Sequence, residues 1–225
     1  MSTLWVYGCS FAAGHGVLGA EADDQMLNQT GRIAFPDHSF GKFCADELGM
    51  DSCLRALSGS SNFYILDQLI NDIGDIQSDD TVVIMWTYPD RTMFTDEQEN
   101  EYHMLAANSG FSERSRFYYE TLYSDRRSKV ETTSLICAAN NLCLAKNARI
   151  VNTTFWQTQV KGLAWFYNRK LLNDIDISFP ECMMYRTKDT ELNFYCHDGY
   201  HPSLAVHKDY GVRLAQYIRD KYEQD

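Results

Sequence analysis

The run from Thr81 to Thr87, TVVIMWT, constrains the fold more than any other segment of the chain. It is β-branched and apolar on both faces, which is typical of a central strand in a parallel sheet that is covered on both sides. Shorter apolar runs predict strands at Leu4–Tyr7, Cys53–Leu57 and Arg149–Phe155, and a further short strand near Met183–Arg186.

Between these strands, apolar residues recur at helical spacing. The pattern predicts helices over residues 40–48, 63–73 and 130–146, and a last helix that begins shortly after Pro202. Residues 20–37 have mixed polarity and no period. Strands that alternate with helices predict an α/β protein, built as a three-layer α/β/α sandwich with a mostly parallel central sheet.

The chain of 225 residues is expected to form a single domain over residues 1–225. Residues 92–127 are polar and rich in aromatic side chains, and we interpret them as an insertion over one edge of the sheet. Their internal structure cannot be predicted from the pattern.

Charge and cysteine content exclude several function classes. Twenty Lys and Arg residues against thirty-one Asp and Glu residues give a net charge of −11, which repels nucleic acid and anionic membranes. The N-terminus lacks the pattern of a signal peptide, and no stretch reaches the roughly 18 apolar residues of a membrane span. Seven cysteines without a C-x-x-C pair suggest reduced thiols. We therefore expect a cytoplasmic protein.

Two segments far apart in the chain carry residues for nucleophilic catalysis. Ser10 follows the first predicted strand after Gly8, and the carboxyl ends of parallel strands are where ligands bind in such sheets. Asp198 and His201 precede the last helix, and a turn through Gly199 can bring the carboxylate against one imidazole nitrogen. A serine hydroxyl needs such a base within reach, so the three side chains together predict a catalytic triad.

At these two segments the chain resembles the SGNH/GDSL hydrolases. YGCSF, residues 7–11, is similar to their first block, with Cys9 where Asp is commonest, and DGYHP, residues 198–202, is similar to their last block. The resemblance implies the flavodoxin-like SGNH hydrolase fold. It also implies Ser10 as nucleophile, His201 as base and Asp198 as its partner, with no metal or organic cofactor.

The oxyanion site matches the family less well. LSGSSN, residues 57–62, resembles the second block, whose glycine implies a backbone N–H donor at Gly59. The third block, usually Gly-x-Asn-Asp, reads MWTYPDR at residues 85–91, so the usual asparagine donor is missing. A functioning enzyme needs a substitute. Asn62 is our first candidate, although its amide could equally cap its own helix. The next candidates are Thr87 and Arg91, which we also expect to contact substrate.

The predicted function is hydrolysis of a small ester, such as a short acyl chain or an acetyl group on a carbohydrate, through an acyl-enzyme. The expected partner is therefore a small-molecule or carbohydrate ester, and the sequence does not indicate an oligomeric state. The main alternative is a non-catalytic binding or structural protein that keeps the fold but has lost the oxyanion site.

Three further alternatives remain open. Cys196, His197 and Asp198 could bind zinc together with His201, since nitrogen and sulfur ligands at this spacing suit the metal. Cys9 could be the nucleophile, although neighbouring positions at a strand end tend to point oppositely and favour a buried thiol. The glycine-bearing loop after the first strand could bind a phosphorylated ligand in a flavodoxin-like domain, but it lacks phosphate-loop spacing.

Overall fold

A parallel β-sheet forms the centre of the molecule in a computed structural model that describes residues 2–96, 101–105, 116–154, 175–178, 196–197 and 201–223. The described strands of this sheet lie in the order β2-β1-β3-β6-β7, and every neighbouring pair is parallel. Their bounds are β1 (Thr3–Tyr7), β2 (Asp51–Leu54), β3 (Thr81–Trp86), β6 (Arg149–Thr154) and β7 (Ile175–Ser178).

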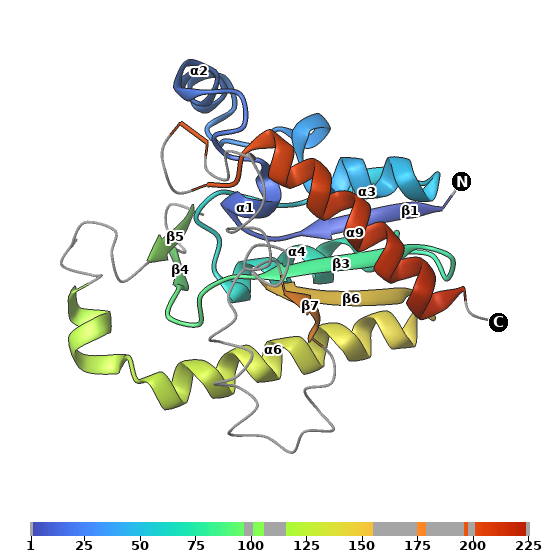
Figure 1. The fold of residues 1–225 in the computed structure, drawn as a ribbon. Helices are drawn as coiled ribbons and strands as arrows, with labels where there is room; N and C mark the ends of the chain where they lie inside the picture. Colours follow the sequence, from blue (N-terminus) through green and yellow to red (C-terminus); the bar gives the residue numbers. More distant parts are fainter. Residues whose placement is uncertain are drawn as a thin grey trace, which may run out of the picture.

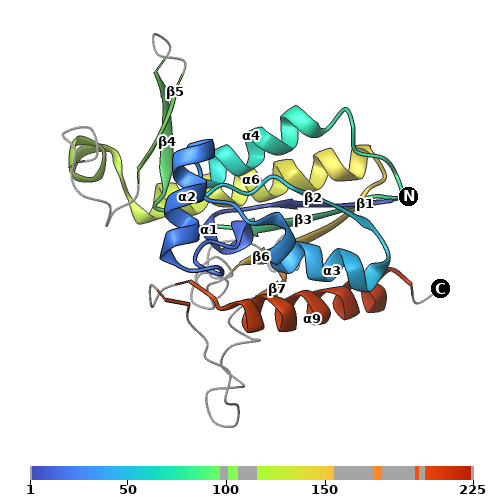
Figure 2. The same ribbon diagram turned by 90° about the horizontal axis from the view of Figure 1, so that it is seen from above.

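Helices cover both faces of the sheet, which confirms the predicted three-layer α/β/α architecture. One face carries α3 (Phe40–Leu48) and α9 (Leu204–Tyr222), and the other carries α4 (Asn62–Asp72) and α6 (Asp125–Ala145) (Figures 1 and 2). Alternate side chains of a strand point to opposite faces, so each strand contributes to two cores.

The sequence of β1 shows this division. Leu4 and Val6 belong to the core under α3 and α9, while Trp5 and Tyr7 belong to the core under α4 and α6. The strand β3 is buried at every position from Thr81 to Trp86, as its apolar run predicts. The central strands β1 and β3 therefore separate two apolar cores.

The order of the strands places a binding crevice at the end of β1. From β1 the chain runs to β2 on one side, and β3 then pairs with β1 on the other side. Loops at such a reversal point separate and leave a crevice at the carboxyl ends of the strands. The short helix α1 (Ser10–Ala13) begins at this place.

The predicted strands and helices are largely confirmed, with small changes at their ends. The helix predicted over residues 40–48 is α3, with the same bounds, and Ser39, Ser61 and Ser124 cap α3, α4 and α6 with their side chains. The strand predicted at Cys53–Leu57 overlaps β2. The strand predicted near Met183–Arg186 lies outside the described residues.

Residues 20–37 show no period in the sequence, yet the structure has the helix α2 (Ala20–Thr30) there, followed by the 3-10 helix η1 (Pro36–His38). In α2 the buried residue is Asp23, so the helix has no apolar stripe that could reveal it. Within residues 92–127, the structure describes an antiparallel pair, β4 (Thr92–Asp96) and β5 (Glu101–Leu105), and the π-helix η2 (Tyr118–Leu122). None of the described helices is long and apolar enough to cross a membrane.

Candidate active site

Ser10 is the first residue of α1 and lies directly after β1. Gly8, two residues earlier, lets its neighbours approach the backbone closely. A Cβ at this position would lie 2.6 Å from the Cβ of Ala12 and 3.2 Å from that of Met85. The side chain of Ser10 is buried, with 4% of its surface exposed. Cys9 belongs to the core cluster under α3 and α9 and is fully buried, which favours a packing role over a nucleophilic one.

His201 lies at the same end of the sheet. Its ring centroid is 5.3 Å from that of Phe11, the residue after Ser10. Its ring also stacks on the imidazole of His15, with centroids 4.2 Å apart and planes 6° apart. The segment before α9 therefore brings an imidazole to the helix that begins with Ser10.

Asp198 lies outside the described residues, so its side chain is not described. Among the described residues on either side of it, the backbone N–H of Cys196 donates to the carbonyl of His201 at 2.9 Å. Within the described ranges, no group of three or more His, Cys, Asp and Glu side chains could hold a metal ion.

The buried carboxylate of Asp23, which lies beside His15 and His197, was not predicted from the sequence. Asp23, on α2, lies 3.7 Å from His15 Nε2 and 3.7 Å from His197 Nε2, and it accepts a hydrogen bond from the Gly16 N–H. His15 Nδ1 is 2.9 Å from Ser58 Oγ. Of this cluster, only His197 was singled out from the sequence, as a possible zinc ligand, because no recognisable motif marks the side chains of His15, Asp23 and Ser58.

The second block begins beside the end of β1. The N–H of Leu57 donates to the carbonyl of Gly8, two residues before Ser10. Gly59 has a φ of 84°, which favours glycine. Among the described residues, neither the N–H of Gly59 nor that of Ser10 donates a hydrogen bond within the protein, so both can serve a ligand.

Asn62 is placed differently from our first expectation. It is the first residue of α4 and is buried, and its Nδ2 donates to the carbonyl of Thr87 at 3.1 Å and to Thr132 Oγ1 at 3.3 Å. Its Oδ1 accepts from the N–H of Thr87 at 2.8 Å. Both amide hydrogens are engaged, so Asn62 joins the second block to the third and has no hydrogen left for an oxyanion. Sequence spacing alone could not show these partners.

The third block presents polar atoms that lack protein partners. Thr87 Oγ1, Asp90 Oδ1 and Arg91 Nη1 are buried and have no hydrogen-bond partner in the described part of the chain. Burial raises the pKa of the Asp90 carboxyl, and the nearby Arg91 guanidinium opposes this rise. Buried polar groups are rarely left unsatisfied, so water or a ligand is expected here. The guanidinium of Arg91 also lies 5.4 Å over the ring of Tyr88.

Comparisons with known proteins were made by sequence and by structure. No family model matches the chain, and no curated protein matches it by sequence. Solved structures do match. A protein of the G-D-S-L lipolytic family from Desulfitobacterium hafniense DCB-2 has a TM-score of 0.57 and 11% identity, covering 96% of this chain and 99% of its own.

Two carbohydrate esterases are also similar. The acetyl xylan esterase Est2A from Butyrivibrio proteoclasticus has a TM-score of 0.58 and 16% identity over 99% of this chain. A carbohydrate esterase whose active site displays divergent catalytic and non-catalytic binding functions has a TM-score of 0.58 and 14% identity over 98%. The chain spans 64% and 65% of the lengths of these two proteins. This chain therefore has the fold of the SGNH/GDSL hydrolases.

Proposed function

We propose that the protein is a serine esterase of the SGNH/GDSL family that hydrolyses small esters through Ser10, His201 and Asp198. The observation that supports this most directly is the contact of the His201 ring with Phe11, beside Ser10. These residues come from opposite ends of the chain. The esterase and lipolytic families of the similar structures support the same chemistry.

The reaction follows from the roles of the three side chains. His201 takes the proton of the Ser10 hydroxyl as the oxygen attacks the ester carbonyl, and Asp198 stabilises the imidazolium that forms. The tetrahedral intermediate collapses, and His201 returns the proton to the leaving alcohol. Water then attacks the acyl-serine by the same proton path, which releases the carboxylic acid and restores the hydroxyl.

Backbone donors are the best candidates for the oxyanion site. The N–H groups of Ser10 and Gly59 are unengaged among the described residues and lie on neighbouring loops. Such preorganised donors stabilise the negative charge that develops on the carbonyl oxygen. Because both hydrogens of the Asn62 amide are engaged, we assign Asn62 to holding the third block in position.

The substrate is proposed to be a short acyl or acetyl ester, with a carbohydrate as one possible alcohol. An acetyl xylan esterase among the similar structures supports this class. The unpartnered atoms of Thr87 and Arg91 support a role for these residues in binding polar groups of the substrate.

Turnover of p-nitrophenyl acetate tests the proposal. Ser10→Ala is expected to lower kcat by about a thousandfold or more, because the nucleophile is removed. Ser134→Ala is a matched control, since its hydroxyl is exposed on α6 and bonds the carbonyl of Val130. The control should keep wild-type turnover.

One observation favours a second function. The third block lacks its asparagine and Asn62 is engaged elsewhere, so the oxyanion site has fewer donors than is usual in the family. A non-catalytic carbohydrate-binding protein would have this feature. Equal rates of p-nitrophenyl acetate hydrolysis for wild type and Ser10→Ala would favour the binding protein and contradict the esterase.

A further inference from the structure

A cavity of about 330 Å³ lies between α2, the end of β2 and α4, outside the triad. Its volume is at the small end of the range for ligand sites, and it would hold a group the size of a benzoate ring or a single sugar. Apolar side chains line part of it, among them Met26 and Leu54. Two arginines, Arg32 and Arg55, line the same cavity.

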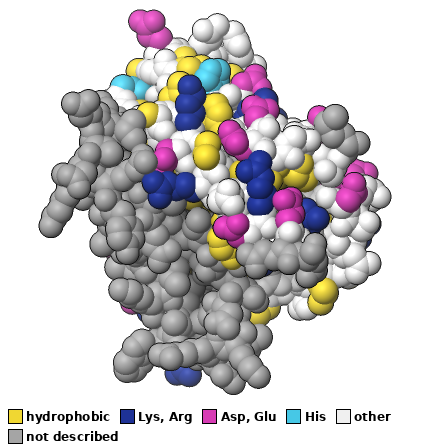
Figure 3. All heavy atoms as spheres, turned by 45° about the vertical axis from the view of Figure 1, so that its right-hand side comes forward, with side chains coloured by type: hydrophobic (Ala, Val, Ile, Leu, Met, Phe, Trp, Pro, Cys, Tyr) yellow, Lys and Arg dark blue, Asp and Glu magenta, His cyan; other side chains and the backbone are white. Residues whose placement is uncertain are grey.

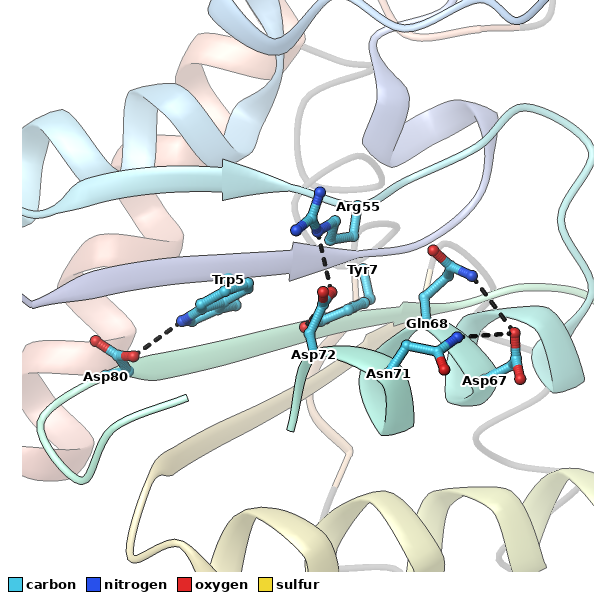
Figure 4. Close-up of polar contacts among 8 residues, drawn as sticks. All are labelled: Trp5, Tyr7, Arg55, Asp67, Gln68, Asn71, Asp72 and Asp80. Carbon is cyan, nitrogen blue, oxygen red and sulfur yellow. Dashed lines mark hydrogen bonds and ion pairs between the residues drawn. The ribbon is translucent and has the colours of Figure 1, made fainter. Parts of the chain in front are cut away.

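Arg55 is held in place by its neighbours. Its Nε donates to Asp72 Oδ2 at 3.0 Å, and the same oxygen accepts from the hydroxyl of Tyr7 at 3.1 Å (Figure 4). The guanidinium also lies 5.9 Å over the ring of Trp5. The terminal nitrogens of Arg55 have no hydrogen-bond partner among the described residues, so they can donate to a ligand.

Arg32 has no ion-pair or hydrogen-bond partner for its guanidinium in the part of the chain that the structure describes. On the face shown in Figure 3, basic side chains lie among acidic ones. The described residues that line the cavity include two arginines and no Asp or Glu, which leaves a local excess of positive charge that suits an anion.

The cavity adjoins the candidate active site. Leu57 lines it, and the Leu57 N–H donates to the carbonyl of Gly8 at 3.1 Å, two residues before Ser10. The next residue, Ser58, contacts His15, which stacks on His201. A ligand in the cavity would therefore lie next to the loop that carries the Gly59 N–H.

From this arrangement we propose that the cavity is a substrate subsite that binds a carboxylate group of the ester, through Arg32 and Arg55. Its role as a substrate subsite rests on the proposed function, whereas the binding of a carboxylate in the cavity does not. The apolar lining packs against the carbon skeleton, while the guanidinium groups bind the carboxylate oxygens. The carboxylate could belong to the alcohol part, as in an acylated uronic acid, or to the acyl part, as in a half-ester of a dicarboxylic acid.

Calorimetric titration tests binding without any turnover. The probes are 4-hydroxybenzoate and its neutral analogue 4-hydroxybenzamide. Wild type should bind the benzoate at least about tenfold more tightly, and Arg32→Gln should remove this preference. Arg32 is exposed, so the variant is expected to fold. Arg213→Gln removes one positive charge from an exposed pair with Asp209 and is the matched control.

The proposal is overturned if wild type binds the two probes equally, or if Arg213→Gln lowers benzoate binding as much as Arg32→Gln does. The second result would mean that only the overall charge matters. Because these titrations need no catalysis, failure of the esterase proposal would not affect them.

Kinetics then identify the source of the carboxylate. A preference for 4-acetoxybenzoate over 4-acetoxybenzamide that is lost in Arg32→Gln assigns the group to the alcohol part. A preference for mono-4-nitrophenyl succinate over 4-nitrophenyl butyrate that is lost in Arg32→Gln assigns the carboxylate to the acyl part. If the neutral esters are hydrolysed and neither charged ester is preferred, the cavity is not a substrate subsite and the proposal is wrong.

Discussion

His15 contacts side chains from three other segments at the candidate site. Its ring stacks on His201, its Nδ1 lies 2.9 Å from Ser58 Oγ, and its Nε2 lies 3.7 Å from Asp23. Because polar contacts hold the His15 ring at both nitrogens, the orientation of the His201 ring that stacks on it is restricted. We therefore regard His15 as a positioning residue for His201.

The first prediction concerns this stack. His15→Ala should lower kcat for p-nitrophenyl acetate by about tenfold to a hundredfold with little change in KM, because the base loses its orientation. His15→Phe should restore much of kcat, since a phenyl ring can stack on His201 without its polar contacts. Steady-state kinetics of both variants check this. Equal losses in the two variants would show that the polar contacts of His15, not the stack, matter.

Single residues were the hardest feature to predict from the sequence. Ser10 and His201 stood in recognisable motifs, and the structure brings their segments together. The contact between His15 and Ser58 joins residues 43 positions apart, and no periodic pattern records such a pair. The engagement of Asn62 by Thr87 and Thr132 depends on how three elements pack, so spacing alone could not show these partners.

At the scale of elements, close contact between α3 and α9 fixes the last loop and hence His201. Gly211 makes this approach possible, because a Cβ at this position would lie 2.7 Å from the carbonyl oxygen of Phe40 and 2.7 Å from the Cβ of Phe43. A backbone oxygen cannot move aside cheaply. The two helices would have to separate.

We predict that Gly211→Ala destabilises the protein by about 1–3 kcal/mol, as overpacking does. Gly74→Ala is the control, since a Cβ there meets no atom within 4 Å, and it should change stability by less than about 1 kcal/mol. Urea unfolding measures both. A Gly211→Ala variant as stable as wild type would contradict the tight packing of α3 on α9.

Elements that bury an apolar face were predictable, and those that do not were missed. The buried strand β3 and the amphipathic helix α3 left clear patterns. The exposed helix α2 left none, yet it supplies Asp23 to the site and Met26 to the cavity. Part of the candidate site thus comes from a helix with little sequence signal.

At the scale of the whole molecule, His207 links stability to pH. It is fully buried on α9, and its Nδ1 accepts a hydrogen bond from the N–H of Phe40 at 3.1 Å. Burial, with a smaller contribution from the charge of His201, lowers the pKa of His207 to about 3 from its usual 6.5. Between about pH 3 and pH 6.5, His207 is therefore neutral in the folded protein, while the unfolded chain binds a proton there.

Because the folded pKa is the lower one, stability is complete above about pH 6.5 and is lost as the pH falls toward 3. The loss should reach at most about 1.4 kcal/mol per pH unit. His207→Asn keeps an acceptor for Phe40 but does not titrate, so its stability should depend less steeply on pH. Urea unfolding of wild type and variant between pH 4 and about pH 7.5 checks this. Parallel curves for the two proteins would contradict the assignment.

The central claim is that Ser10 is a nucleophile activated by His201. Labelling with a fluorophosphonate probe, followed by peptide mapping, tests it most directly, since the probe reacts with an activated serine. The account predicts that wild type is labelled at Ser10 and that His201→Ala is not labelled. Labelling at another residue, or equal labelling of Ser10 in His201→Ala, would contradict it.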